Sequence, residues 1–378
     1  MATGSSSLDK RVTVPNLNED VLTVILSKLP VKSLMRFKCV CKSWYSLITS
    51  PTFVAMHFNN KDRHKDFLAF VVGGRVVISL SISFLSYHTV QYSSNLSQNF
   101  HNTHFIGFCN GLLCVVANEL TFHIINPATK ESKVLKEPNK PLDSPSYGFA
   151  FDSKVNDYKV VRVTLERTEI LTLKSNSWRS IFMTDRSTSV MKGVSTLVDL
   201  WSSAVMNNAL HWIGLRLDLN KKVIVAFDLV NEEFRDIKVP DHPNSSDLFC
   251  PSRHQCYVFQ DCLSMTISYG FSSNRKIEVW LMKEYGVEGS WTKRYCFSTS
   301  VHDLYVKTIF EFIRGPRIND DWPLRSSNDQ LALSSAFSTK ESFFDNIKLH
   351  PDLGGHIFNY TETLVPIERE EDQFHFGW

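Results

Sequence analysis

The sequence lacks the features that would place the protein in a membrane or among secreted chains. It has no apolar run approaching the ~18 residues that a membrane-spanning helix needs. Its first residues, MATGSSSLDKR, contain no apolar segment of the kind found in secretory signals, so we expect no signal peptide. A formal net charge of +2 and a pI of about 8.1 are too balanced to favour nucleic acid or an anionic membrane as partner.

Enzyme signatures are also missing. No G-x-S-x-G nucleophile elbow and no phosphate-cradling glycine loop occurs. Cys250, Cys256 and Cys262 are six residues apart, which is not the spacing of zinc ligands. We therefore expect no metal, no cofactor and no catalytic residues, and we interpret the eight cysteines as reduced thiols of a cytoplasmic or nuclear protein.

What the sequence does contain is apolar and aromatic surface, at 43% and 12% of its 378 residues, enough for one large globular domain and a small one. Residues 14–51 indicate three short helices. Asn18 suits an N-cap, and apolar residues then recur at helical spacing until Pro30. A second helical stripe begins near Ser33 and ends at Pro51.

This segment carries more apolar surface than three short helices can bury among themselves. The surplus either packs on the rest of the chain or binds a partner, and the pattern alone leaves both open. Fixed letters extend over more than thirty positions, including Glu19-Asp20-Val21, Leu29-Pro30 and Cys41-Lys42-Ser43-Trp44. In these the segment resembles the F-box of plant F-box proteins, although Asn18 stands where that family usually has proline.

The resemblance implies that the surplus face binds the Skp-type linker subunit of a cullin-based ubiquitin ligase. The residues that it assigns to this contact are Pro15, Leu17, Val21, Leu22, Ile25, Leu26, Leu29, Pro30, Leu34, Phe37, Val40, Cys41, Trp44 and Leu47.

Beyond residue 66 the apolar period changes from helical to extended, and short strands alternate with polar turns. Six turns, at Gly73, Asn126, Ser175, Asn231, Glu288 and Lys340, are 49 to 57 residues apart. A repeat near 50 residues with four short strands is typical of a kelch-type propeller blade. The fold class predicted is α+β: a three-helix F-box followed by an all-β, propeller-like domain of about six blades.

The β region resembles the F-box-associated domain of the same plant proteins, through Gly107-Phe108-Cys109-Asn110-Gly111, Asn126-Pro127 and Ser177-Trp178 among others. Its closing strand is expected at residues 363–367. The domains predicted are a disordered start (1–10), the F-box (11–58), an exposed basic linker segment (59–65, its polar character beginning near Met56), the β domain (66–367) and an acidic, aromatic tail (368–378). Within the family the S-locus F-box-like group is the nearest resemblance.

Function follows from the resemblance: a non-catalytic substrate adaptor that holds a target protein for ubiquitination. A secreted ribonuclease recognised in self-incompatibility is one implied target; targets in defence, hormone or stress signalling are others. Two further readings stay open, an enzyme built on a propeller and a scaffold that binds the linker subunit without forming a ligase.

Target recognition is expected in three long segments that interrupt the repeat, 182–201, 240–262 and 313–330. Arginine and tryptophan are enriched at binding hot spots. The residues assigned to target binding are Arg186, Lys192, Trp201, Arg314, Arg317, Trp322 and Arg325.

Overall fold

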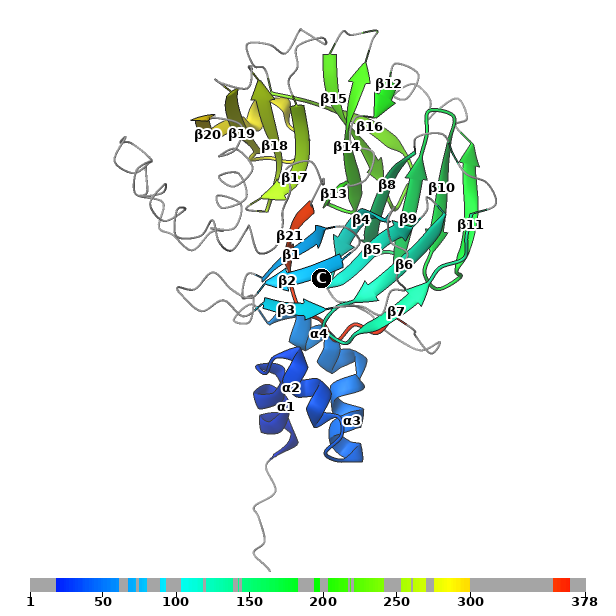
Figure 1. Cartoon of the computed structure of the whole chain (residues 1–378), viewed down its shortest axis with the longest axis vertical. Helices are drawn as coiled ribbons and strands as arrows, with labels where there is room; N and C mark the ends of the chain where they lie inside the picture. The colour runs from blue at the N-terminus through cyan, green and yellow to red at the C-terminus, as the bar shows by residue number, and fades with distance from the viewer. Residues whose placement is uncertain are drawn as a thin grey trace, which may run out of the picture.

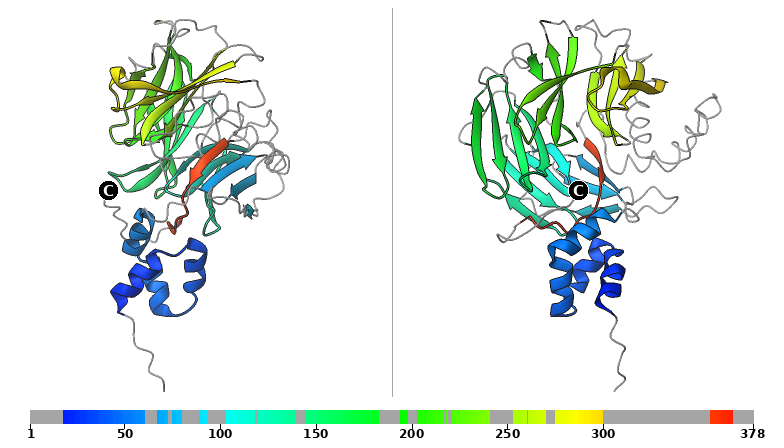
Figure 2. Two further views of the ribbon diagram at one scale, coloured as in Figure 1. Left: turned by 90° about the vertical axis from the view of Figure 1, so that its left-hand side faces the viewer. Right: turned by 180° about the vertical axis from the view of Figure 1, so that it is seen from behind.

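The computed structural model describes residues 18–60, 67–72, 75–79, 89–92, 103–117, 120–138, 142, 145–182, 194–197, 203–216, 218, 221–240, 253–259, 261–269, 275–299 and 356–367. In this part of the chain, four α-helices precede five antiparallel sheets. Figures 1 and 2 show the helices projecting as a separate module from one edge of the sheets. None of these helices is long and apolar enough to cross a membrane.

The helical module contains α1 (Glu19–Ser27), α2 (Val31–Phe37), α3 (Lys42–Thr49) and α4 (Pro51–Asn59). The Asn18 side chain caps α1 as predicted, by accepting a 3.0 Å hydrogen bond from the Asp20 N–H. The helical stripe predicted from Ser33 to Pro51 is divided into α2 and α3 by a turn at residues 38–41, so this region contains three helices as predicted. Phe37 and Trp44, expected on one stripe, still meet across this turn, with ring centroids 5.4 Å apart in an edge-to-face contact.

Helix α4 was not predicted. Pro51 begins it instead of ending its predecessor, since proline fits the first helical position and the Ser50 hydroxyl accepts a hydrogen bond from the Phe53 N–H. The expectation that an exposed segment starts near Met56 is therefore wrong for His57 and Phe58, whereas Met56 and Asn59 are exposed on the helix. His57 is buried, and its Nε2 lies 3.0 Å from the carbonyl oxygen of Leu29 at the end of α1.

The sheets follow one another along the chain, each a meander of short strands. The first is β1 (Phe67–Val72), β2 (Arg75–Ser79) and β3 (Thr89–Tyr92), joined by β21 (His356–Tyr360); the second is β4 (Thr103–Cys109), β5 (Leu112–Ala117), β6 (Thr121–Asn126) and β7 (Glu131–Val134). The third is β8 (Ser146–Asp152), β9 (Asp157–Val163), β10 (Arg167–Thr172) and β11 (Ser177–Phe182). The fourth is β12 (Val194–Leu197), β13 (Ala204–Met206), β14 (Ala209–Arg216), β15 (Lys221–Asp228) and β16 (Phe234–Lys238); the fifth is β17 (Arg253–Phe259), β18 (Cys262–Tyr269), β19 (Arg275–Met282) and β20 (Trp291–Thr299).

The sheets are arranged around a common centre as propeller blades, with the edge strands β21, β4, β8, β13 and β17 next to one another (Figure 1). The first blade takes its innermost strand from the far end of the chain, because β21 pairs with β1 from Phe67↔Tyr360 to Val71↔His356. Chain ends that meet in one sheet were expected, but the strand is residues 356–360 rather than 363–367. Residues 361–367 run on without pairing in a sheet.

The predicted blade number is wrong for the described residues, which form five sheets instead of six. The turns at Asn126, Ser175, Asn231 and Glu288 each join the third and fourth strands of a blade. The turn at Gly73 joins the second and third, so the repeat was counted from a different turn. The sixth turn, at Lys340, lies outside the described residues.

One face of the propeller carries tight turns. Strand direction alternates within a blade, so the turns after the first and third strands lie on the same face as the start of β1, which α4 precedes. We call it the helix-side face. The residues with positive φ all occur in these turns: Asn110, Gly111, Lys130, Asn156, Asn176, Asn207, Asn208, Glu232, Asp261 and Gly286.

Tryptophans join successive blades. Trp178, Trp212 and Trp291 donate Nε1–H hydrogen bonds to the carbonyls of Lys136, Tyr147 and Lys238, at 2.6, 2.9 and 2.9 Å. Each bond runs from one blade to the blade before it, and Trp212 is fully buried. Because the indole N–H is satisfied while the ring fills apolar space, each contact fixes both the distance and the register between blades.

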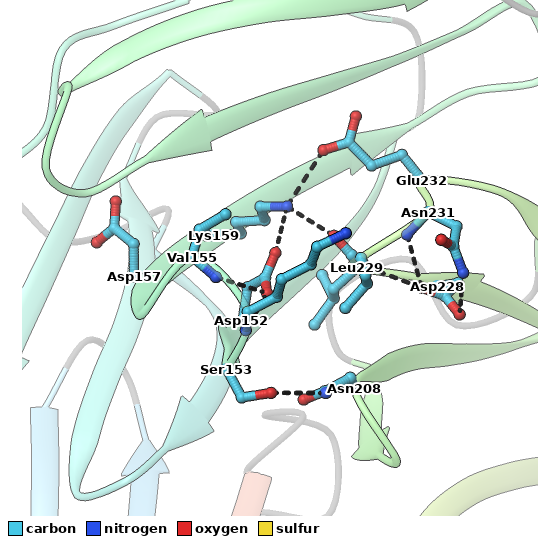
Figure 3. A network of polar contacts seen from close by, with 12 residues as sticks. Asp152, Ser153, Val155, Asp157, Lys159, Asn208, Asp228, Leu229, Asn231 and Glu232 are labelled. Atoms are coloured by element: carbon cyan, nitrogen blue, oxygen red, sulfur yellow. Dashed lines mark hydrogen bonds and ion pairs between the residues drawn. The ribbon is translucent and has the colours of Figure 1, made fainter. Parts of the chain in front are cut away.

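A charged contact joins the third and fourth blades (Figure 3). The buried Lys159 Nζ lies 2.6 Å from Asp152 Oδ2, 2.6 Å from the Leu229 carbonyl and 3.1 Å from Glu232 Oε1. Burial alone would raise the pKa of the Glu232 carboxyl, but hydrogen bonds from Arg179 and Lys159 outweigh it, and the pKa falls below its usual value.

Candidate functional site

The helical module has apolar side chains on opposite faces of the same helix. In α1, Leu26 is 1% exposed, while Ile25 beside it is 47% exposed. Leu26, Val31, Leu34 and Ile48 are buried in one core with residues of the second blade. The inner face of α1 is covered by its own chain; the outer face is not.

The uncovered positions lie in two places. Val21, Val24 and Ile25 form the outer face of α1, each about half exposed. Val40 in the turn before α3 is 60% exposed, and Tyr45 in α3 is also exposed. We call these five residues the exposed apolar set. Side chains of this size stabilise a complex by roughly 1.5–3 kcal/mol each when fully buried, so together they favour an interface with another protein.

The residues assigned to linker binding differ in their exposure. Val21, Ile25, Pro30, Val40 and Cys41 are exposed, whereas the half-buried residues Leu22, Leu29, Phe37, Trp44 and Leu47 pack against the core. The assignment of Leu26 and Leu34 to the linker contact is corrected by the structure. Both side chains are buried, so they pack inside the core and present no surface to a partner. Pro15 and Leu17 lie outside the described residues.

Val24 and Tyr45 were missed, although the signal for Val24 was present. Val21, Val24 and Ile25 are spaced three and four apart, as are the inner residues Leu22, Leu26 and Leu29. From the sequence alone these two apolar stripes cannot be separated and form a single predicted face. Exposed basic side chains also accompany the set: Lys28, Lys32, Arg36 and Lys42. The surface therefore suits a partner that is apolar at the contact and acidic around it.

The residues assigned to target binding, from Arg186 to Arg325, all lie outside the described residues and stay predictions. Two of the three segments predicted for target recognition contain strands: β12 lies within 182–201 and β17 within 240–262, so these segments are not loops throughout. The strand ends on either side of residues 183–193 and 239–252 can be placed. Phe182 ends β11 and Val194 begins β12, while Lys238 ends β16 and Arg253 begins β17. By strand direction all four ends lie on the propeller face opposite the helix-side face.

A charged cavity of about 330 Å³ opens between the third and fourth blades, lined by Asp152, Asp157, Lys159, Arg179 and Glu232 among others. Its carboxylates are already engaged. Asp152 accepts from the Lys154 N–H and pairs with Lys159, and Asp157 accepts from the N–H groups of Tyr158 and Lys174. Glu232 accepts from Lys159 and Arg179. Groups held in this way stabilise the junction between blades and are poorly placed for proton transfer.

Two cysteines have the C-x₄-C spacing found in some zinc sites, Cys109 and Cys114. They lie on the hairpin strands β4 and β5. Burial raises the pKa of the Cys109 thiol to about 12 and that of the buried Cys114 well above its ordinary value. Metal ligands must be thiolates, so these side chains are suited to packing.

The architecture is that of a binding protein: a small helical module with an exposed apolar set, attached to a propeller. Comparison with known proteins gives the same class. Residues 14–55 match the F-box domain, and residues 66–315, more than half of the chain, match the F-box associated beta propeller domain. The chain therefore belongs to the plant F-box proteins with an F-box associated beta propeller domain.

Similar proteins of Arabidopsis thaliana extend over most of the chain. F-box protein At3g07870 is 28% identical over 75% of this chain and 73% of its own length. F-box/kelch-repeat protein At3g23880 is 27% identical over 74% of this chain and 78% of its own length. F-box protein CPR1 is 26% identical over 72% of this chain and 71% of its own length. The similarity therefore extends over about three quarters of each chain.

Proposed function

We propose that the protein is the substrate-recognition subunit of a Skp–cullin–F-box ubiquitin ligase in the cytoplasm or nucleus. The exposed apolar set binds the Skp-type linker subunit, and the propeller holds a target protein. The observation that carries the proposal is an F-box whose helix α1 leaves Val21, Val24 and Ile25 uncovered although the opposite face of the helix is buried.

The chain contributes proximity and no bond chemistry. Bound through its helices to the ligase and through its propeller to the target, it converts ubiquitin transfer into a reaction within one complex, which raises the effective concentration of target lysines. The engaged carboxylates of the charged cavity agree with a non-catalytic role.

For the target we propose the propeller face opposite the helix-side face. Its described strand ends flank residues 183–193, which contain Arg186 and Lys192, whereas the helix-side face is made of tight turns. Trp201 lies between β12 and β13. Loops that interrupt a repeat are where binding residues concentrate. The printed names of the similar proteins identify F-box and kelch-repeat proteins and give no target, so a ribonuclease of self-incompatibility stays a prediction from resemblance.

The test is binding of a purified Skp-type linker subunit to Ile25→Asp and Val21→Asp variants. Either change places an unpaired charge in an apolar contact, which costs several kcal/mol, so affinity should fall more than about tenfold. The matched control is Val155→Asp, in a turn of the third blade, because Val155 is 50% exposed and Ile25 is 47% exposed. Wild-type affinity in both α1 variants would remove the assignment of this face.

Co-purification from plant tissue distinguishes a ligase from a scaffold. A ligase subunit captures cullin together with the linker subunit, and both disappear in the Ile25→Asp variant. A scaffold that binds the linker subunit alone captures it without cullin, which would contradict the proposal.

A further inference from the structure

The last described residues of the chain, 361–367, run from β21 along the helix-side face towards the helical module (Figure 2). We call this segment the C-terminal strap. Leu364, Val365 and Ile367 are 3%, 1% and 3% exposed, and they lie in the same core as Leu26 and Val31 of the helices. A segment without sheet pairing is thus as deeply buried as the propeller core, and part of what it contacts is the helical module.

Asn126 holds the strap against the second blade. Its Nδ2 donates to the carbonyl oxygens of Thr363 and Val365, at 3.2 and 2.9 Å. Its Oδ1 accepts from the N–H groups of Ala128 and Thr129 in the β6–β7 turn. The buried Asn126 side chain therefore provides hydrogen-bond partners for both the strap and the turn. Displacing the strap would leave buried polar groups without partners.

Gly111 shows how closely the strap fits. It lies in the β4–β5 turn with φ of +80°, and a Cβ built there would be 2.2 Å from Thr363 Cγ2 and 2.8 Å from the Thr361 carbonyl oxygen. No side chain fits in that space. Gly286, in the turn before β20, has nearly the same φ of +81° but no heavy atom within 4 Å of the corresponding Cβ.

The strap also completes a helix of the F-box. Helix α2 starts after Pro30, which offers no side-chain cap. The Val31 N–H instead donates to Glu362 Oε2 at 3.3 Å, across 331 residues of sequence. A carboxylate at a helix N-terminus accepts a hydrogen bond from an N–H that has no partner within the helix, and it is attracted by the positive end of the helix dipole.

A second carboxylate connects the other end of the strap. Glu131 Oε2, at the start of β7, accepts a 3.2 Å hydrogen bond from the Ile367 N–H. Burial lowers the pKa of Lys38, at the end of α2, and the nearby Glu131 charge partly offsets this. The strap is thus bonded to the N-terminus of α2 through Glu362 and to the second blade through Glu131.

From these contacts we propose that the C-terminal strap fixes the orientation of the linker-binding helices relative to the propeller. Its role is positioning. With the strap in place, a target on the propeller would be presented to the rest of the ligase at one distance; with the strap displaced, helices and propeller keep their own folds but not their mutual angle. The consequence for ubiquitin transfer rests on the function proposed above, whereas the orientation itself does not.

The experiment measures the distance between two labels, introduced as non-canonical amino acids at the exposed positions Ser46 in α3 and Lys154 in the third blade. Full-length wild type and Gly286→Ala should each give one narrow distance distribution. Gly111→Ala and Glu362→Ala should broaden or shift it. Gly286→Ala is the matched control, because it imposes the same strain of positive φ without touching the strap. If Gly111→Ala fails to fold, Glu362→Ala, which removes one half-buried side chain of the strap and its bond to the Val31 N–H, carries the test.

Affinity for the linker subunit is measured on the same proteins. The proposal expects equal affinity in wild type, Glu362→Ala and Gly286→Ala, with a changed label distance in Glu362→Ala alone. Distributions identical to wild type in both strap variants would overturn it. Failure of the wild-type chain to bind the linker subunit would overturn the proposed function and leave the label measurement valid, so the two proposals fail separately.

Discussion

The Tyr285 hydroxyl lies 2.7 Å from Nε2 of His211, and the pair connects the fourth and fifth blades. Arg235 donates to the same hydroxyl at 2.6 Å, with its guanidinium 4.9 Å from the ring centroid. The Ala204 carbonyl can only accept, so His211 Nδ1 carries a proton and donates to it at 3.1 Å. In neutral histidine Nε2 therefore accepts from the Tyr285 hydroxyl.

This pair predicts a loss of stability in acid. Burial lowers the pKa of His211 from 6.5 to about 4, and the nearby Arg235 charge adds to the effect despite the hydrogen bond to Ala204. Between these values the unfolded chain binds more protons than the folded one, so stability falls as pH drops from 6.5 to 4 and is independent of His211 above that window. The loss is about 3 kcal/mol. Urea denaturation across this window should show a shallower pH dependence for His211→Gln; parallel curves would exclude His211 as the cause.

Neighbouring residues of α1 should separate stability from binding. Leu26→Ala opens a cavity in the core shared by helices and propeller and should destabilise the protein by about 2–5 kcal/mol. Ile25→Ala should leave the melting temperature within about a degree of wild type and weaken linker binding, because a surface change costs less than ~0.5 kcal/mol. The melting temperature and the dissociation constant of both variants check this. A stable Leu26→Ala protein would contradict the burial assigned to Leu26.

Removing one partner of the buried ion pair between Lys159 and Asp152 should destabilise the protein strongly. Lys159→Met leaves Asp152 without its cation in a site that is 1% exposed, and about 3–5 kcal/mol of stability should be lost. Adding Asp152→Asn should recover part of that loss, since the amide oxygen can still accept from the Lys154 N–H. Lys154→Met, on the same turn but exposed, is the control. Equal stability of the single and double variants would show that Asp152 tolerates losing its partner.

Truncation should locate the closing strand. A chain that stops after residue 355 lacks β21, which leaves the edge of β1 unpaired and should promote oligomers. A chain that stops after residue 367 keeps β21 and the strap and should stay monomeric with an unchanged melting temperature. Light scattering and thermal unfolding compare the two, and a monomeric protein ending at 355 would argue against closure by β21.

Sequence reasoning succeeded where a signal is local. Asn18 predicted the start of α1, and the alternation of short apolar stretches with polar turns predicted the strands of the β domain. It failed where the answer depends on a distant partner. The resemblance to the F-box-associated domain predicts the closing strand at residues 363–367, yet the apolar residues there are buried in the core shared with the helices, and the strand that closes the ring is defined by its pairing with β1. Leu26 and Ile25 are equally apolar, and only the place where the propeller packs decides which of them faces outward.

Ring closure by β21 has a consequence for synthesis. The helices and β1 leave the ribosome first, but the strand and strap that complete them are encoded about 300 residues later. At ~5–20 residues per second, the F-box spends roughly 15–60 s without Glu362 or the core residues of the strap. A messenger RNA cut short near its 3′ end would therefore yield a chain that has an F-box and most of a propeller but holds them at no defined angle.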